Sequence, residues 1–431
     1  MEEKKVLIIA YYFPPMGMGG VQRVAKFVKY LPLFDWKPYV LTVKEVDYWA
    51  KDHSLLEEIP PEVKVIRTGS FDPLRISFIL KSFFKRRRQK DESAQKKSVK
   101  ISKLASWLFF PDNKVGWIPF ALMKGLKLCR KEKIDLIFSS SPPPSLHMTG
   151  YLLWHLTGIP WIADFRDPWS GYKIKTSPTP FHLFLKKRME RLIINNVVKV
   201  TTANPAITTD LKSRHPHTEK ILKIDQGYDE DDFASYQSSI PEIFTIGYLG
   251  TFSPDCDPEP FFSALGDLIY QGAIPKNKVK FVHVGVSMGI DLDHLIEKYN
   301  LREVVQQKDY LSHRESLSEM KKVSLLLLVT SDHPLVFPAK VYEYLRLNKP
   351  ILGIFPQGSQ IAKFLTEIKA GKVISPEDKE GIKQVLVSCF TDFTEGKIDS
   401  ITSDDEISKY ERKSLTFKLA SLFDKVSRRP C

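Results

Sequence analysis

Cysteine is scarce in this chain of 431 residues, and its four cysteines are scattered without a paired spacing, at Cys129, Cys256, Cys389 and Cys431. Such cysteines predict neither a disulfide framework nor a zinc site, and a reducing cytoplasm is the expected compartment. Long apolar runs are missing as well. The N-terminal apolar stretch is too short to span a membrane and lacks a small-residue cleavage site, so we expect the first buried strand there.

Two further absences concern metals and cofactors. The acidic run at residues 229–232 (DEDD) does not have the spacing of a calcium loop, and we interpret it as a solvated hinge. Gly17, Gly19 and Gly20 do not have the GxGxxG spacing of a dinucleotide site, and no acidic residue ends the second expected strand as a ribose ligand would. We therefore expect no metal and no cofactor, and a nicotinamide enzyme is disfavoured.

Positive charge, in contrast, is in excess, because the formal net charge is +13. This excess predicts an anionic partner, which could be nucleic acid, anionic lipid or a phosphate-bearing substrate; charge alone does not choose among them. With 43% hydrophobic residues the chain can fold without covalent cross-links, and its length is typical of two domains.

Short apolar runs alternate with amphipathic stretches along most of the sequence, which predicts parallel α/β sheets. Strands are expected near residues 6–12, 38–43, 134–139, 161–164 and 198–202, and again near 244–249, 279–284, 304–307, 325–329 and 351–354. The two series predict Rossmann-like, doubly wound domains at 1–226 and 227–405, with a linker near 227–241 and a C-terminal helix within 406–431. Substrates of such a pair bind in the cleft that the carboxyl ends of both sets of strands face.

The alternation stops at about residues 74–127, where aromatic residues flank a dense basic run. Phe83 and Phe84 precede the run at 85–90 (KRRRQK), and an aromatic group at 107–110 follows a spacer rich in Lys and Ser. Apolar side chains beside cations are typical of a segment that lies on an anionic membrane. A solvated basic loop between two core helices is one alternative, and a nucleic-acid patch without a recognised module is another.

Two motifs at helix starts indicate phosphate chemistry. Gly19 and Gly20 lie between the first strand and a helix, where close backbone approach and the helix N-terminus suit an anion. In FPAKVYEYL, Lys340 opens a helix after a strand and Glu343 lies one turn further on. Glu343 can accept hydrogen bonds from both ribose hydroxyls, while Lys340 and the helix N-terminus can meet a diphosphate. The alternatives are a simple glycine turn and an ordinary amphipathic helix.

The motif WIADFRDPW ends another strand with alternating acid, base and acid, at Asp164, Arg166 and Asp167. Ionisable groups at a strand end are costly to bury and are usually paired or functional. These three residues are therefore the candidate catalytic group on the acceptor side, and an ion pair between Arg166 and one aspartate is the structural alternative.

Taken in order, several motifs carry a resemblance over nearly the whole chain: YYFPPMGMGGVQRVAKFVKYL, FPDNKVGWIPFA, SSSPPPS, IPWIADFRDPW, QGYDEDDF, IGYLGTF, HVG and FPAKVYEYLRLNKPIL. The sequence resembles the retaining glycosyltransferases of family four, of the bacterial cell-surface polysaccharide type, which have the GT-B fold of two Rossmann-like domains.

The resemblance implies roles for individual residues. Glu343 corresponds to the second of the family's two glutamates, and the first would fall at Leu335, which leaves the usual contact to the donor sugar open. Arg166 takes the place of a family histidine. Gly250 follows a strand in which many members carry an arginine, and it is implied on the donor side together with His283 of HVG. The C-terminal helix is implied to pack back across the domain junction.

The implied activity is transfer of a hexosyl group from a nucleotide diphosphate donor to a lipid-linked or saccharide acceptor, with retention and without a metal. In the implied front-face mechanism the leaving diphosphate oxygen takes the acceptor's proton, so the protein's task is electrostatic. A sugar-nucleotide epimerase of the same fold and a catalytically silent membrane-surface scaffold stay open as alternatives. The expected location is the cytoplasm, with peripheral attachment to the inner face of the cell membrane and no nucleic-acid partner.

Overall fold

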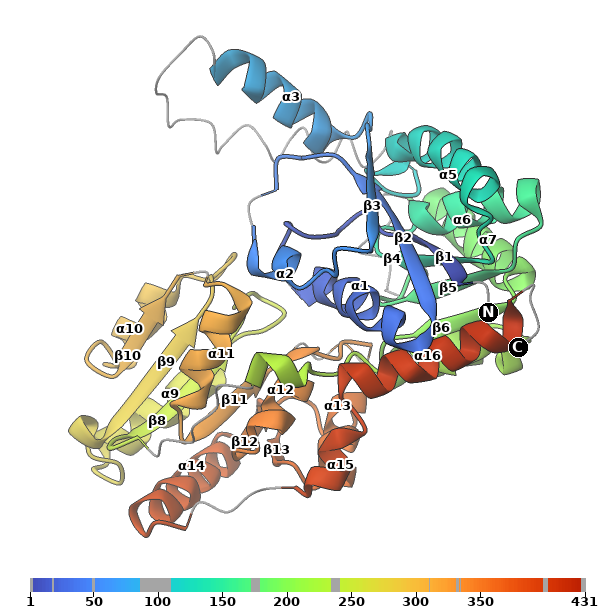
Figure 1. The fold of residues 1–431 in the computed structure, drawn as a ribbon. Coiled ribbons are helices and arrows are strands. Elements are labelled where there is room, and N and C mark those ends of the chain that lie inside the picture. Colours follow the sequence, from blue (N-terminus) through green and yellow to red (C-terminus); the bar gives the residue numbers. More distant parts are fainter. Residues whose placement is uncertain are drawn as a thin grey trace. The chain divides into compact units, whose positions relative to one another are not determined.

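The computed structural model describes residues 3–17, 19–48, 51–85, 110–171, 179–233, 241–309, 311–330, 333, 335–397 and 402–427. The chain forms two compact units (Figure 1). The first comprises Met1–Asp225 together with Leu415–Cys431, and the second comprises Gln226–Ser414. The last helix therefore begins in the second unit and belongs mostly to the first.

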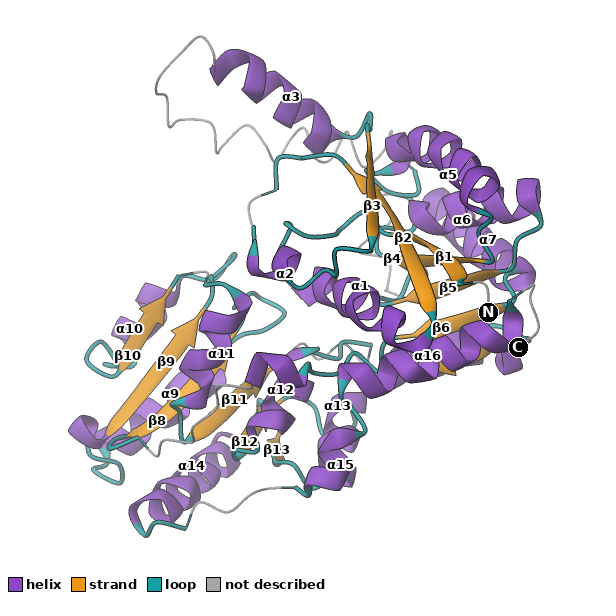
Figure 2. Cartoon of the chain, in the orientation of Figure 1, coloured by secondary structure: helices purple, strands orange, loops and turns teal. Residues whose placement is uncertain are grey.

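A seven-stranded parallel sheet forms the centre of the first unit, in the order β3-β2-β1-β4-β5-β6-β7 (Figure 2). The strands are β1 (Lys4–Ile9), β2 (Trp36–Val43), β3 (Lys64–Thr68), β4 (Leu136–Ser141), β5 (Trp161–Phe165), β6 (Lys199–Thr202) and β7 (Ile221–Lys223). The helices are α1 (Gly19–Tyr30), α2 (Ser54–Glu57), α3 (Pro73–Lys85), α5 (Ile118–Glu132), α6 (Ser145–Thr157), α7 (Pro180–Asn196), α8 (Pro205–Arg214) and α16 (Arg412–Val426). The strand order reverses between β1 and β4, which is where sheets of this kind bind ligands.

Alternate residues of the central strands point to opposite faces of this sheet, and each face has its own helices. Leu7 and Ile9 of β1 pack in one core with residues of α5, α6 and α7. Val6 and Ile8 pack in a second core with residues of α1 and α16. Because the central strands are buried on both faces, their sequences are apolar runs and not alternating patterns.

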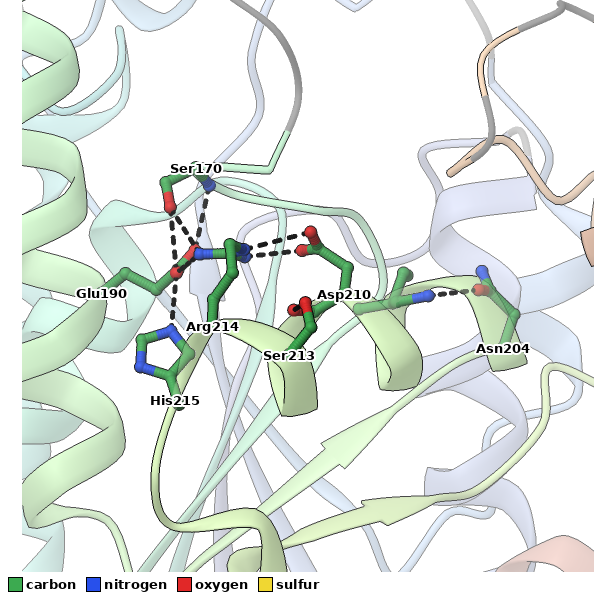
Figure 3. Close-up of polar contacts among 8 residues, drawn as sticks. Ser170, Glu190, Asn204, Asp210, Ser213, Arg214 and His215 are labelled. Atoms are coloured by element: carbon green, nitrogen blue, oxygen red, sulfur yellow. Dashed lines mark hydrogen bonds and ion pairs between the residues drawn. The ribbon is translucent and has the colours of Figure 1, made fainter.

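A buried carboxylate connects α7 to α8 and to the loop after β5 (Figure 3). Glu190 accepts hydrogen bonds from the backbone N–H and the hydroxyl of Ser170, both at 2.9 Å, and pairs with Arg214. His215 lies 2.9 Å from the same carboxylate, and Arg214 also binds Asp210 at 2.5 Å. Burial opposes ionisation of Glu190, but these partners lower its pKa to about 2, so it stays charged at neutral pH.

The second unit contains a six-stranded parallel sheet in the order β10-β9-β8-β11-β12-β13. The strands are β8 (Phe244–Leu249), β9 (Val279–Val284), β10 (Val305–Lys308), β11 (Leu325–Val329), β12 (Ile351–Ile354) and β13 (Lys372–Ile374). The helices are α9 (Glu259–Tyr270), α10 (Leu292–Lys298), α11 (His313–Lys321), α12 (Lys340–Leu347), α13 (Gln360–Glu367), α14 (Lys379–Thr394) and α15 (Asp404–Ser408). Two apolar cores cover the two faces of the sheet. Its strand order reverses between β8 and β11.

Both predicted doubly wound sheets are present, so the predicted fold class is confirmed. The regular pattern extends further than expected, because α3 and α5 lie within or overlap the region 74–127. The basic run from residue 86 onward and the aromatic group at 107–109 fall outside the described residues. Among the helices of the described ranges, none is both long enough and apolar enough to cross a bilayer.

The interpretation of the acidic run at 229–232 as a solvated hinge is wrong. Glu230 accepts a hydrogen bond from Arg346 Nε at 2.6 Å, and the Asp232 carboxylate lies 3.2 Å from His313 Nε2. Both partners belong to the second unit, so polar contacts hold the run against α11 and α12. A run of four acidic residues looks solvated in a sequence because its basic partners are more than 80 residues away.

Candidate functional site

The first candidate site lies at the carboxyl edge of the first unit's sheet, where β1, β4 and β5 end beside the start of α1. Arg166 directly follows β5, and its Nε and Nη2 donate to the carbonyl oxygens of Ser141 and Pro142 at 3.0 and 2.8 Å. The third guanidinium nitrogen, Nη1, is buried and has no hydrogen-bond partner among the described residues. A Cβ built on Gly20 would lie 3.7 Å from this nitrogen. The unused donor of Arg166 therefore faces the start of α1.

Positive charge converges at this point. The N-terminus of a helix carries a partial positive charge, and a buried donor without an acceptor costs free energy until an anion or water satisfies it. Gly19 stands at the same helix start, and no atom of the described residues lies within 4 Å of a Cβ built on it. Burial lowers the pKa of Arg166, but a guanidinium remains charged at neutral pH. The arrangement can hold one anionic group such as a phosphate.

Asp164 has a different environment from the one its motif suggested. Its carboxylate is fully buried and accepts bonds from Arg23 Nη2 at 2.8 Å and Nε at 3.1 Å, in a two-pronged ion pair. The hydroxyls of Ser140 and Thr201 donate to the two oxygens at 2.7 Å each. Burial raises the carboxyl pKa, but the bonds from Arg23 more than offset this, and the net pKa lies below the ordinary value. These contacts hold β5 against β4, β6 and α1; a catalytic role for Asp164 stays a prediction.

Asp167 is the exposed member of the group. It follows Arg166 at the same edge of the sheet, and the opposite charges of the two side chains attract each other. The structure thus separates the three predicted residues by environment: a saturated buried carboxylate, a buried guanidinium with one free donor, and a solvent-facing carboxylate. Of the three residues, only Asp167 is exposed, and the free Nη1 of Arg166 is buried behind the start of α1.

A polar network that the sequence did not predict lies at the same edge. The Tyr11 hydroxyl donates to Asp72 at 2.8 Å, and Lys114 Nζ lies 3.6 Å from the same carboxylate and 5.2 Å from the Tyr11 ring centre. Both charged side chains are buried. Asp112 accepts from the backbone N–H of Ser145 at 2.7 Å and so caps the start of α6. The motif FPDNKVGW was visible, but Asp72 follows β3, a strand that the apolar pattern did not reveal.

The second candidate site lies at the carboxyl ends of β8 and β9 in the second unit. The Gly250 carbonyl accepts a hydrogen bond from His283 Nε2 at 2.9 Å. Gly285, which follows HV, has φ +142°, and a Cβ on it would lie 2.2 Å from the Gly250 oxygen, so only glycine fits. His283 thus positions the loop, and burial lowers its pKa, so the ring is neutral. Its implied place on the donor side stays a prediction.

Lys340 brings a cation to the same loop. Its Nζ lies 3.9 Å from the centre of the Tyr248 ring, and a Cβ on Gly250 would lie 2.6 Å from it. Burial lowers the pKa of Lys340 to about 8, against the raising effects of Cys256 and Glu343. The ammonium is therefore held at the first residue of α12, next to Gly250, which has no side chain, and it adds to the positive end of the helix.

Glu343 lies one turn into α12 and faces a histidine. Its Oε1 is 3.6 Å from His313 Nε2, the nitrogen that lies 3.2 Å from Asp232. The His313 side chain is only 9% exposed. The Tyr344 hydroxyl, on the same helix, accepts from the backbone N–H of Leu249 at 3.0 Å and ties α12 to the end of β8. The structure thus brings Gly250, Lys340 and Glu343 to one edge, with His313 and Asp232 as neighbours that the sequence did not link to them.

Neither a protein-family model nor a curated protein matches this sequence, whereas solved structures match almost throughout. HepE from Anabaena in complex with UDP gives a TM-score of 0.67 at 14% identity, covering 98% of this chain and 100% of HepE. Sucrose-phosphate synthase from Thermosynechococcus elongatus gives 0.65 at 13% identity, with 98% of both chains covered. A glycosyltransferase from Rickettsia africae gives 0.63 at 13% identity, with 99% of both chains covered.

The fold is that of the GT-B glycosyltransferases. This agrees with the fold that the sequence motifs implied, and the match extends over both units. At identities of 13 to 14% the similarity shows the fold alone. The roles of individual residues must therefore be argued from the contacts that those residues make in this structure.

Proposed function

We propose that this chain is a glycosyltransferase that uses a nucleotide diphosphate sugar as donor. The observation that carries the proposal is the cluster in the second unit, where the Lys340 ammonium, the start of α12 and the bare Gly250 loop meet beside the Glu343 carboxylate. In such a cluster, the Lys340 ammonium and the helix N-terminus can bind a diphosphate, and the Glu343 carboxylate can accept hydrogen bonds from ribose hydroxyls. The solved complexes of HepE, which hold UDP or UDP-glucose, support the same ligand class.

The finer features of the reaction are part of the proposal. Lys340 and the α12 N-terminus stabilise the charge that grows on the leaving diphosphate, so a retaining, metal-independent transfer of a hexosyl group needs no further cation. Arg166 and Asp167 lie at the carboxyl edge of the first unit and are proposed to position a saccharide or lipid-linked acceptor for polysaccharide synthesis. Sugar transfer to an acceptor separates this function from an epimerase, and donor binding separates both from a silent scaffold.

The pH dependence of donor binding follows from Lys340. Since burial lowers its pKa to about 8, the ammonium is present at pH 7 and is lost as the pH rises through 8. The terminal phosphate of UDP is already fully ionised above pH 8, so the affinity for UDP is expected to fall between pH 8 and 9.5 because Lys340 loses its charge. Calorimetric titration at each pH measures this, with Lys340→Met as the control, because its weaker binding should not change over that range. A wild-type affinity that does not vary would contradict the role of Lys340.

Asp167→Asn is expected to depress sugar transfer far more than donor binding. The exposed carboxylate lies next to Arg166 at the edge proposed for the acceptor, whereas the donor cluster is in the other unit. Transfer is measured as labelled sugar incorporated into acceptor, and donor affinity by calorimetry on the same preparation. Equal losses in both measurements would assign Asp167 to the donor site or to the scaffold.

A further inference from the structure

The outer surface of α7 is an unusual one for a helix of a globular domain. Phe181, Phe184, Lys187, Arg188 and Arg191, which we call the α7 face, are all exposed. At 3.6 residues per turn they fall within about 120° of the helix circumference, so they form one contiguous stripe. Two exposed phenylalanines, 64% and 52% accessible, therefore share a stripe with three cations.

Within the described residues, few acidic side chains offset this charge on the helical layer that contains α7. The helices α5, α6 and α7 pack on the same face of the sheet. Between them they contain only two acidic residues, Glu132 and Glu190. The helix α8 packs on the same face and adds Asp210, but this carboxylate is paired with Arg214 at 2.5 Å. Glu190 is buried and paired with Arg214, as Figure 3 shows, and Glu132 accepts a hydrogen bond from the Tyr39 hydroxyl at 3.0 Å. The outer surface of the layer is left basic, and α5 adds the exposed Lys127, Arg130 and Lys131.

The apolar component of the α7 face indicates what kind of anionic surface it fits. The Arg188 guanidinium lies 5.6 Å from the Phe184 ring centre, so cation and aromatic ring stand side by side. Rings that enter the acyl boundary while cations meet the head groups are the pattern of interfacial helices. A nucleic-acid duplex would use the cations but would gain little from two large hydrophobic side chains at one end of the stripe, because its bases are already stacked.

The position of the stripe also fits a membrane-borne acceptor. α7 follows β5 and starts at the carboxyl edge of the sheet, the edge that carries Arg166 and Asp167, so Phe181 and Phe184 lie toward that edge. The Phe110 ring contacts His182 with centroids 5.8 Å apart. The chain that follows the basic and aromatic segment therefore returns to the sheet beside the first turn of α7.

We propose that the α7 face docks this protein on an anionic lipid membrane, with Phe181 and Phe184 inserted and Lys187, Arg188 and Arg191 at the head groups. This surface lies within the first unit and does not depend on donor binding. Only its consequence rests on the proposed function: the acceptor is then lipid-linked and reaches the Arg166 edge from the membrane.

Vesicle flotation with the full chain tests the proposal. Vesicles of phosphatidylcholine with one third phosphatidylglycerol should float the wild type, and pure phosphatidylcholine vesicles should not. Replacing Lys187, Arg188 and Arg191 by Ser should lower the partition coefficient on the order of 100-fold, because each cation near an anionic surface contributes about a factor of five. Phe181→Ser with Phe184→Ser should remove the binding that persists at high salt, since the insertion of rings is not screened.

A matched control changes the same charge elsewhere. Lys363, Lys369 and Lys372 are exposed in the second unit, and their replacement by Ser should leave flotation unchanged. Equal losses in the control and the α7 variants would reduce the effect to net charge and overturn the proposal. So would loss of flotation only on changing Arg86, Arg87 and Arg88, with the α7 variants behaving as wild type, because the basic segment would then be the docking element.

Two more readouts keep the outcomes distinct. The first readout is binding to an oligonucleotide. If this binding is sensitive to salt and the phenylalanine changes do not affect flotation, the surface binds nucleic acid and the proposal is overturned. Binding of UDP by the α7 variants should equal that of the wild type. If the wild type binds no UDP but still floats through the α7 face, the proposed function fails while the docking surface stands.

Discussion

Replacing Arg23 by Met is expected to lower the free energy of unfolding of the first unit by about 3 to 5 kcal/mol, the scale measured when one partner of a buried ion pair is removed. Arg23 and Asp164 are both fully buried, with Nη2 and Oδ1 at 2.8 Å. Without Arg23, the carboxylate would keep only the Ser140 and Thr201 hydroxyls as donors. The cost arises because a buried carboxylate is left without a counter-ion.

Urea unfolding followed by tryptophan fluorescence measures this loss cleanly, because all seven tryptophans lie in the first 225 residues and so in the first unit. The double variant Arg23→Met with Asp164→Leu is the control. Replacing both charges by apolar groups should recover much of the stability. A loss below about 1 kcal/mol in the single variant, the range of exposed pairs, would contradict the account that the Arg23 ion pair holds Asp164 in place.

Glu343→Ala is expected to weaken donor binding by about 1.5 to 3 kcal/mol, the range for hydrogen bonds to charged groups, with the fold intact. This corresponds to roughly 10- to 150-fold in affinity. The side chain is proposed to accept from both ribose hydroxyls, and its neighbour His313 lies 3.6 Å away. Fluorescence or calorimetric titration with UDP measures the change.

The control for Glu343→Ala is Glu367→Ala, which removes an exposed carboxylate from α13 of the same unit. Its affinity for UDP should match the wild type. An unchanged affinity in a folded Glu343→Ala protein would remove Glu343 from the donor site.

The two sheets were predictable because buried parallel strands leave a local signature. A strand such as β11 is buried throughout, and its LLLLV sequence shows this without any knowledge of its neighbours. Strands at the sheet edges leave a weaker signature in the sequence. In β3 (KVIRT) only one residue of five is buried, and polar residues interrupt the run, so the apolar pattern was too weak to predict this strand.

The candidate site was predictable only as far as one motif reaches. Lys340 and Glu343 share one helix start, and their spacing placed them together. Asp164 finds its partner 141 positions earlier, in Arg23 of α1, and no local pattern shows that pairing. The one available signal was an arginine among the apolar positions of a helix, where a side chain without a buried acid would be expensive.

His313 and Asp232 were missed near Glu343 for a related reason. His313 stands at the start of α11, where the sequence predicts a packed side chain or a contact to a nucleotide base. Asp232 lies in the run that we interpreted as a solvated hinge, so nothing in the sequence linked the two residues. Charge complementarity between distant segments becomes visible only when the fold brings them together. The same holds for the free Nη1 of Arg166, because its lack of a partner depends on how β4 and β5 end.

The central claim is that this chain binds a nucleotide diphosphate sugar through the Lys340 and Glu343 cluster. The most direct test is calorimetric titration with a panel of sugar nucleotides. It compares the wild type with the double variant Lys340→Met, Glu343→Ala. The account predicts that the wild type binds at least one of them, together with its free nucleoside diphosphate, and that the folded double variant binds neither. Binding of no sugar nucleotide by the wild type, or equal binding by the double variant, would contradict it.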